Sequence, residues 1–150
     1  MDGIFYNIIS EEDKTVAVTF GNSYDGKYTG SIVIPAIVPY NSNSYLVTTI
    51  GEYAFNACSD LTSITIPNSV SSMGCSAFKE CIGLTSVHVS DIASWCNIKF
   101  ETVSSNPLYY AHNLYLNGEE VRDLSIPYSV TKICGNAFDY EKYKKIYKRF

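Results

Sequence analysis

The chain has 150 residues, of which 46% are hydrophobic and 17% are charged, a balance typical of one folded globular domain. Its formal net charge of −4 argues against nucleic acid as a partner, because binding to phosphates needs an excess of Lys and Arg. Nowhere does the sequence hold the run of about 18 apolar residues that a membrane-spanning helix requires, so no membrane span is predicted.

Residues 1–28 predict a β cap at the N-terminal end. Ile4–Ile9 alternates loosely and Thr15–Phe20 alternates well between apolar and polar residues, with a turn at Glu11–Lys14, so a hairpin or meander is expected. Met1–Asn7 has neither a positively charged start nor an apolar stretch, so this chain carries no predicted signal peptide. In a secreted protein that signal would have been removed or trimmed.

From residue 29 to about residue 140 the sequence repeats itself. Ala54–Phe55 returns as Ala77–Phe78 after 23 residues and as Ala137–Phe138 after 60 more. A fixed period in the twenties is typical of stacked-repeat proteins. The spacings leave room for an insert of 9 residues within Ala36–Leu46 and another of 14 residues later. The repeat predicts four stacked parallel strands, namely Thr29–Pro35, Leu61–Pro67, Leu84–Ser90 and Val121–Pro127.

Each predicted strand has one apolar and one polar side. In the second strand Ile64 and Ile66 are two residues apart, so their side chains point to the same side. Ser63 and Thr65 point to the other side, and this alternation indicates a half-buried strand. Proline follows at Pro67, and because it lacks an N–H it ends the ladder there.

The second half of each copy is expected to form a turn, or one to two turns of helix or 3₁₀-helix. Val70, Met73, Ala77 and Phe78 lie near helical spacing, but Gly74 argues against a long helix. Phe78 is predicted to fill the core. Each copy is too small to bury its own apolar side, so stacking must supply the partner surface.

An insert at about 91–120 interrupts the repeats. Asp91 is placed to cap a short helix over Ile92–Ile98 by accepting backbone N–H bonds. Leu114–Val121 contains Asn117-Gly118, which favours a hairpin with a two-residue type I′ turn. Residues 141–150 alternate basic and apolar residues in a pattern that predicts a C-terminal helical cap.

These motifs together resemble the BspA-like leucine-rich repeat family. The resemblance is carried by Leu61–Cys81 with its recurrences over roughly residues 29–140, and by Asp91–Gly118, which is similar to a variant insert of that family. It implies a right-handed leucine-rich repeat solenoid, an α/β-type superhelix rich in β-structure with short turns or helices, irregular inserts and terminal caps. Residues 1–150 are then one leucine-rich repeat domain. The family brings no catalytic residues to carry over.

The sequence offers little to support an enzyme, a metal site or a cofactor. Five cysteines are present, and Cys58 and Cys81 occupy the same position in adjacent copies. Buried thiols are the favoured interpretation, with a disulfide between these two as the alternative. His88 and His112 are the only histidines, and no ligand spacing or catalytic arrangement places either beside a thiol. We therefore predict a non-enzyme without cofactor or metal.

The predicted function is a non-catalytic protein-binding or adhesion module of a secreted or cell-surface bacterial protein, as the resemblance implies. Its partner is expected to be a protein, such as a host matrix or surface protein. A carbohydrate-binding module using exposed tyrosines is the alternative, and an enzyme is a third. The candidate contact residues lie on the polar side of the strands and in the insert: Ser63, Thr65, Ser86, His88, Asp123, Ser125, Tyr109, Tyr110 and Tyr115.

Overall fold

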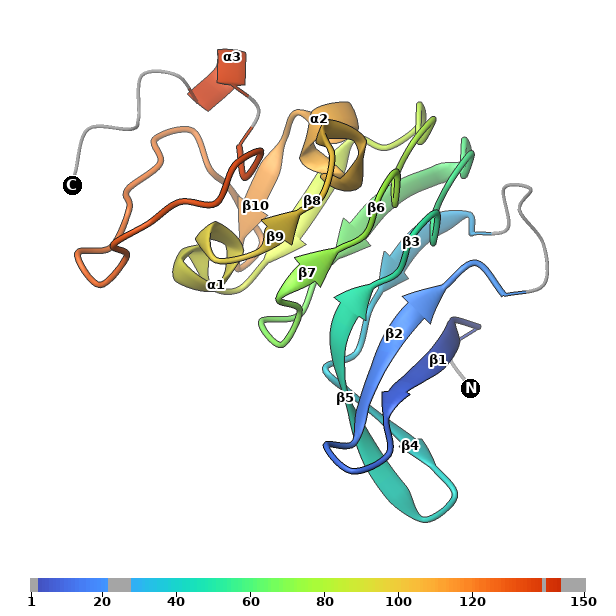
Figure 1. Ribbon diagram of the computed structural model, residues 1–150. Helices are drawn as coiled ribbons and strands as arrows, with labels where there is room; N and C mark the ends of the chain where they lie inside the picture. Colours follow the sequence, from blue (N-terminus) through green and yellow to red (C-terminus); the bar gives the residue numbers. More distant parts are fainter. Residues whose placement is uncertain (1–2, 22–27, 139, 144–150) are drawn as a thin grey trace.

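The computed structural model describes residues 3–21, 28–138 and 140–143. Most of its regular structure lies in two sheets that run side by side along the molecule (Figure 1). Sheet A contains β1 (Phe5–Ser10), β2 (Thr15–Thr19), β4 (Ile37–Tyr40), β5 (Asn43–Ile50), β7 (Ser72–Met73) and β9 (Lys99–Phe100). Sheet B contains β3 (Gly30–Val33), β6 (Leu61–Thr65), β8 (Ser86–Val89), β10 (Leu114–Leu116) and β11 (Glu119–Glu120).

Sheet B confirms the first three predicted strands. β3, β6, β8 and β10 pair in parallel, and Ile64 lies opposite Val87 in the register. The N–H of Ile66 donates to the carbonyl of His88 at 2.9 Å, which continues the β6–β8 register one residue further and sets Ile66 beside Val89. Ile64, Val87 and Leu114 are fully buried, so the inner side of this sheet is the apolar side, as the alternation predicts.

The predicted fourth strand is wrong. Residues 121–127 form no strand, and β10 lies beside β8 instead. The cause is the hairpin of the insert: β10 and β11 are antiparallel, and Asn117 and Gly118 between them both have positive φ, at 51° and 86°. Leu114–Leu116 thus occupies the sheet position beside β8, and β11 lies on its other side, before the chain reaches Val121. Leu124 and Ile126 are still buried in the core, but outside any ladder.

Sheet A contains a parallel ladder that the sequence did not reveal. β2, β5, β7 and β9 pair in parallel, with Val18, Ile50, Met73 and Phe100 in successive register on the inner side. The second half of a copy therefore contains a short strand as well as the expected turns, such as the one over 75–80. β1 and β2 form the predicted N-terminal hairpin, and β2 continues directly into this ladder.

The insert within Ala36–Leu46 is a hairpin that projects from sheet A (Figure 1). β4 and β5 pair antiparallel through a turn at Asn41 and Ser42, which have φ of 47° and 61°. Two consecutive positive φ angles match the right-handed twist of a two-residue hairpin. The stacking half of β5, which pairs with β7, begins beyond this projection.

The insert at about 91–120 contains α1 (Ile92–Cys96), the 3₁₀-turn η1 (Val103–Ser105) and α2 (Leu108–Ala111). The predicted cap of α1 is confirmed, because the Asp91 carboxylate accepts the N–H of Ser94 at 2.9 Å. At the C-terminal end α3 (Tyr140–Tyr143) is helical. The rest of the predicted helical cap, 144–150, lies outside the described residues.

A column of aromatic rings runs through the core. The rings of Phe55 and Phe78 stack with centroids 4.8 Å apart and planes 4° from parallel, and Tyr28 packs on Phe55 at 4.7 Å. Phe55 and Phe78 are both fully buried. Phe78 therefore fills the core as predicted, and it does so by stacking on its counterpart in the preceding copy.

Candidate binding surface

The outer side of sheet B carries two rows of side chains that cross the strands. The register places Ser31, Ser63 and Ser86 in one row. It places Val33, Thr65, His88, Tyr115 and Glu120 in the other. Adjacent members of a row belong to neighbouring strands, which lie about 4.7–4.9 Å apart. These eight residues are called the sheet B face below.

The sheet B face brings together five of the nine predicted contact residues, four from β6 and β8 and Tyr115 from the insert. Ser63, Thr65, Ser86 and His88 lie in register on β6 and β8, as predicted. Tyr115 pairs with His88 and so occupies the place in the row that the sequence had given to Ser125. Asp123 and Ser125 are exposed but lie in no strand, because the β10–β11 hairpin has taken that edge of the sheet.

His88 and Tyr115 form a stacked ring pair on this face. Their rings stack with centroids 4.7 Å apart and planes 20° from parallel, and the Nε2 atom of His88 lies 3.1 Å from the Ser86 hydroxyl. One ring face of each residue is therefore already covered by the other. A sugar ring that stacks on an aromatic side chain needs an open ring face, so this pair offers less to a carbohydrate than two separate rings would.

Tyr109 and Tyr110 belong to α2 and make no ring contact with Tyr115 within the described part of the chain. Their own rings meet edge to face at 5.1 Å and 86°. The Tyr110 hydroxyl accepts the N–H of Glu80 at 3.0 Å, and burial raises the pKa of this phenol. Tyr110 is thus held by the repeats, and Tyr109 is the one of the pair that is half exposed, at 50%.

Glu120 closes the second row and is not among the contact residues predicted from the sequence. Its carboxylate lies 3.3 Å from the Lys142 ammonium and 3.5 Å from the Arg122 guanidinium. The hydrogen bond from Lys142 lowers the pKa of Glu120. Only the strand register, which pairs Glu120 with Tyr115, shows that it belongs to the row.

Residues 40–148 match the model of the BspA type leucine-rich repeat region in 6 copies. The chain belongs to the BspA-type leucine-rich repeat family. The match begins at the last residue of β4 and includes β5 to β11, but not β1, β2 or β3. Leucine-rich repeat regions are generally protein-interaction modules.

Solved structures of bacterial leucine-rich repeat proteins are similar to this chain. A leucine rich cell surface protein from Faecalibacterium prausnitzii is 26% identical with a TM-score of 0.49, over 61% of this chain and 23% of its own. A leucine-rich repeat protein from Bacteroides ovatus is 24% identical with a TM-score of 0.48, over 92% and 37% respectively. One from Bacteroides capillosus is 24% identical with a TM-score of 0.47, over 79% and 96%. The chain thus spans under a quarter of the Faecalibacterium protein. No curated protein matches it.

The described residues of this BspA-type chain assemble no recognisable catalytic or metal centre. They contain no group of three or more His, Cys, Asp or Glu side chains that could hold a metal ion. Ser86 and His88 are within hydrogen-bond reach, but a nucleophile needs a base that a third group orients. In the described part of the chain no carboxylate contacts the His88 ring. Nor does any helix there have the length and apolar character needed to cross a membrane.

All five cysteines are free thiols, and Cys58, Cys81 and Cys96 are buried. Burial raises the pKa of Cys81 to about 12 and that of Cys96 to about 11. Since the thiolate is the nucleophile and the metal ligand, only a small fraction of either thiol is in the reactive form near neutral pH. The predicted buried thiols are therefore found at three of the five positions, while Cys75 and Cys134 are half exposed.

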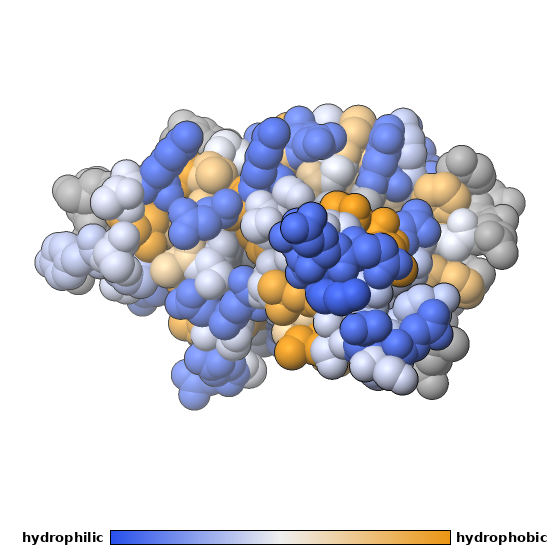
Figure 2. Space-filling model, turned by 60° about the horizontal axis from the view of Figure 1, so that its bottom comes forward, coloured by the Kyte–Doolittle hydropathy of each residue, from blue (hydrophilic) through white to orange (hydrophobic). Residues whose placement is uncertain are grey.

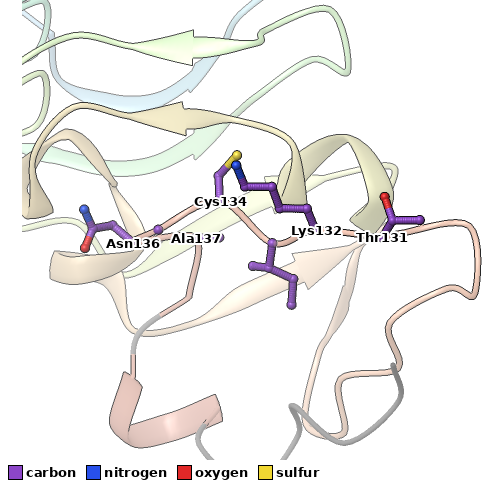
Figure 3. A pocket seen from close by; sticks show the side chains of 7 residues that line it. Thr131, Lys132, Cys134, Asn136 and Ala137 are labelled. Carbon is purple, nitrogen blue, oxygen red and sulfur yellow. The ribbon is translucent and has the colours of Figure 1, made fainter.

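One concavity in the described part of the chain shares no residue with the sheet B face. It has a volume of about 420 Å³ and is lined by Thr131–Ala137 alone. Figure 3 shows the lining side chains arising from one extended segment, with Lys132 and Cys134 near its middle. No polar groups from other elements converge on it, so it does not have the form of an enclosed small-molecule site.

A second exposed feature lies at the end of the molecule that carries the β1–β2 and β4–β5 turns. Figure 2 shows hydrophobic residues lying among strongly hydrophilic ones on this side. Ile37 and Leu46 face each other across the β4–β5 hairpin and are 57% and 41% exposed, and Tyr40 near its tip is 56% exposed. The sequence did not mark this patch, because the hairpin was read only as an insert of known length.

Proposed function

We propose that this chain is a non-catalytic protein-binding domain of a secreted or surface-displayed bacterial protein, and that the sheet B face is its contact surface. In this proposal the repeats wind as a right-handed solenoid, which sets the rows along one flat side. The observation that carries it is the register of the sheet B face. One row of serine hydroxyls and one row of mixed side chains lie on an open sheet, where an extended partner can follow them from strand to strand.

The chemistry of the two rows suits a protein partner. The serine row offers hydroxyls that both donate and accept hydrogen bonds. The second row runs from an aliphatic residue, Val33, which is 62% exposed, through His88 and Tyr115 to the carboxylate of Glu120. Such a graded row presents apolar, aromatic and charged contacts within a short distance, a mixture typical of protein interfaces. Adhesion to a host matrix or surface protein is the specific role we propose.

The test is binding of purified extracellular-matrix proteins to wild-type chain and to a Thr65→Arg/His88→Glu double variant. The matched control is Thr49→Arg/Ser72→Glu, which makes similar changes in a cross-strand pair on the outer side of sheet A. We expect the affinity for at least one matrix protein to fall at least tenfold in the first variant and to stay within twofold in the second. Circular dichroism confirms that both variants fold.

Four outcomes would contradict the proposal. Equal loss in both variants would show a non-specific charge effect. Loss only in an Ile37→Ser/Leu46→Ser variant would move the site to the hairpin patch. Binding of a glycan array but of no matrix protein would favour the carbohydrate alternative. Turnover of any substrate would overturn the non-enzyme assignment.

A further inference from the structure

Two cysteines that lie far apart in the sequence are neighbours in the fold. Cys96 is the last residue of α1, and Cys134 lies in the segment that lines the concavity. The backbone N–H of Cys134 donates to the carbonyl oxygen of Cys96 at 2.9 Å. A direct backbone hydrogen bond holds the two main chains at the separation of paired neighbours, and the Cα atoms of disulfide-linked residues are usually about 4.4–6.8 Å apart.

The thiols of this pair also occupy the same neighbourhood. The Sγ atom of Cys134 lies 3.7 Å from the carbonyl oxygen of Asn97, the residue that follows Cys96. The pKa of Cys96 is raised to about 11, first by burial, then by the charge of Asp91 and then by the thiol of Cys134. The repeat-equivalent Cys58 and Cys81 are both buried. In the pair Cys96 and Cys134, by contrast, one thiol is buried and the other is half exposed.

We propose that Cys96 and Cys134 are an oxidation site, at which a disulfide closes between the insert helix α1 and the segment 131–137. A second observation on the same segment supports this placement. The indole N–H of Trp95 donates to the carbonyl of Ala137 at 2.6 Å, and the side-chain amide of Asn106 donates to the carbonyl of Asn136. The insert therefore already anchors this segment at two points beyond Cys134.

The reaction needs an oxidant, and a low-molecular-weight disulfide supplies it. The half-exposed Cys134 thiol loses its proton and attacks this disulfide, which forms a mixed disulfide and releases one small thiol. The Cys96 thiol then loses its proton and attacks the Cys134 sulfur, which releases the second small thiol. Two protein thiols become one disulfide, and one small disulfide becomes two small thiols, so atoms and electrons balance.

Oxidation would fix the segment 131–137 that lines the concavity. In the reduced state the segment 131–137 is held to the insert by non-covalent contacts, which include apolar packing of Ala137 as well as hydrogen bonds, whereas the disulfide would tie it covalently at Cys134. This proposal is independent of the sheet B face, because none of its residues belongs to either row. It applies wherever the protein meets an oxidising environment, since disulfides persist there and are reduced in the cytosol.

The experiment treats the reduced full chain with excess oxidised glutathione and follows its intact mass. We expect a folded product that has lost two hydrogens, and a proteolytic digest in which the Cys96 and Cys134 peptides are linked. Hydrogen exchange of the backbone amides of residues 131–137 should slow at least threefold on oxidation. Cys75→Ser is the matched control, because Cys75 is the other half-exposed thiol, and this variant should behave as wild type.

The proposal is overturned if Cys134→Ser still loses two hydrogens, if the digest links a different pair, or if only glutathione adducts form on Cys134. Absence of any product under conditions that oxidise the urea-unfolded chain also overturns it. Because Ser keeps the backbone hydrogen bond to Cys96, Cys134→Ser is expected to fold. Unchanged near-ultraviolet circular dichroism of this variant confirms that a missing disulfide reflects the missing thiol.

Discussion

At the scale of single residues, the closeness of adjacent copies is clearest at the glycines. A Cβ atom at Gly83 would lie 2.1 Å from the carbonyl oxygen of Ser59, and one at Gly74 would lie 2.6 Å from the N atom of Glu52. Both obstacles are main chain of the preceding copy, which cannot rotate away as a side chain can. Gly135 lies in the last copy, and a Cβ atom there would meet nothing within 4 Å.

This contrast predicts opposite outcomes for the same substitution. Gly83→Ala should lower the free energy of unfolding by about 1–3 kcal/mol, the usual cost of overpacking a filled interior. Gly135→Ala should change it by less than about 0.5 kcal/mol, as expected for an open surface position. Urea unfolding of the two variants measures both values. Equal losses in the two would mean that copies are not in backbone contact at Gly83.

At the scale of elements, α1 depends on its N-terminal cap. Asp91 accepts the backbone N–H of Ser94 at 2.9 Å and its hydroxyl at 2.6 Å. These hydrogen bonds lower the pKa of Asp91, because they favour the ionised carboxylate. A carboxyl whose folded-state pKa is depressed stabilises the fold above its unfolded pKa, and this contribution is lost as the pH falls through the folded value.

Asp91→Ala should therefore cost about 0.5–2 kcal/mol of stability at pH 7, the usual cost of losing an N-cap. The difference in free energy of unfolding between variant and wild type should narrow as the pH falls below about 4, the pKa of Asp in unfolded chains. Asp91→Asn is the control, because Asn caps helices nearly as well but does not titrate. Thermal unfolding at pH 7 and in acid measures this. A gap that stays constant with pH would show that the carboxylate charge is irrelevant.

The elements also show where sequence reasoning works. β6 and β8 could be predicted because their copies are in perfect 23-residue register, and α1 because Asp91 precedes an apolar helical pattern. β7 and β9 could not, since each has two residues and alternation needs about four residues to be detected. The fourth strand was misplaced because Val121–Pro127 matches the repeat while Leu114–Leu116 reaches the sheet edge first.

The candidate surface was predictable only where it follows from the repeats. The positions of Ser63, Thr65, Ser86 and His88 follow from alternation within the repeats. That Tyr115 and not Ser125 continues their row depends on a long-range pairing between the insert and β8. The same holds for Glu120, and for the approach of Cys134 to Cys96, which no local pattern encodes.

At the scale of the whole molecule, the aromatic column joins successive copies into one core. The buried apolar residues form a single cluster that includes Ile4, Phe55, Phe78, Trp95 and Tyr143. Because the rings of Phe55 and Phe78 stack across two copies, removal of either ring disturbs the packing of both copies. Trp95 in the insert belongs to the same cluster and reports on a distant part of it.

Phe78→Ala should lower the free energy of unfolding by about 3–5 kcal/mol, the range for removing a buried aromatic ring. This loss in free energy of unfolding should be the same when it is measured by Trp95 fluorescence and by far-ultraviolet circular dichroism, because a single cluster unfolds as one unit. Ile82→Ala, at a side chain that is 78% exposed, should have little effect. A loss below about 1 kcal/mol would mean that Phe78 does not hold the core.

The β4–β5 hairpin has a consequence for engineering. Its tip at Asn41 and Ser42 stands clear of both ladders, and the pairing of β5 with β7 begins only at Thr49. Lengthening a flexible loop costs only about 0.6 kcal/mol for each doubling, so a foreign peptide spliced between these two residues would burden the core little. The tip is thus a suitable insertion site for displayed epitopes or affinity tags, which the paired strands β4 and β5 would support.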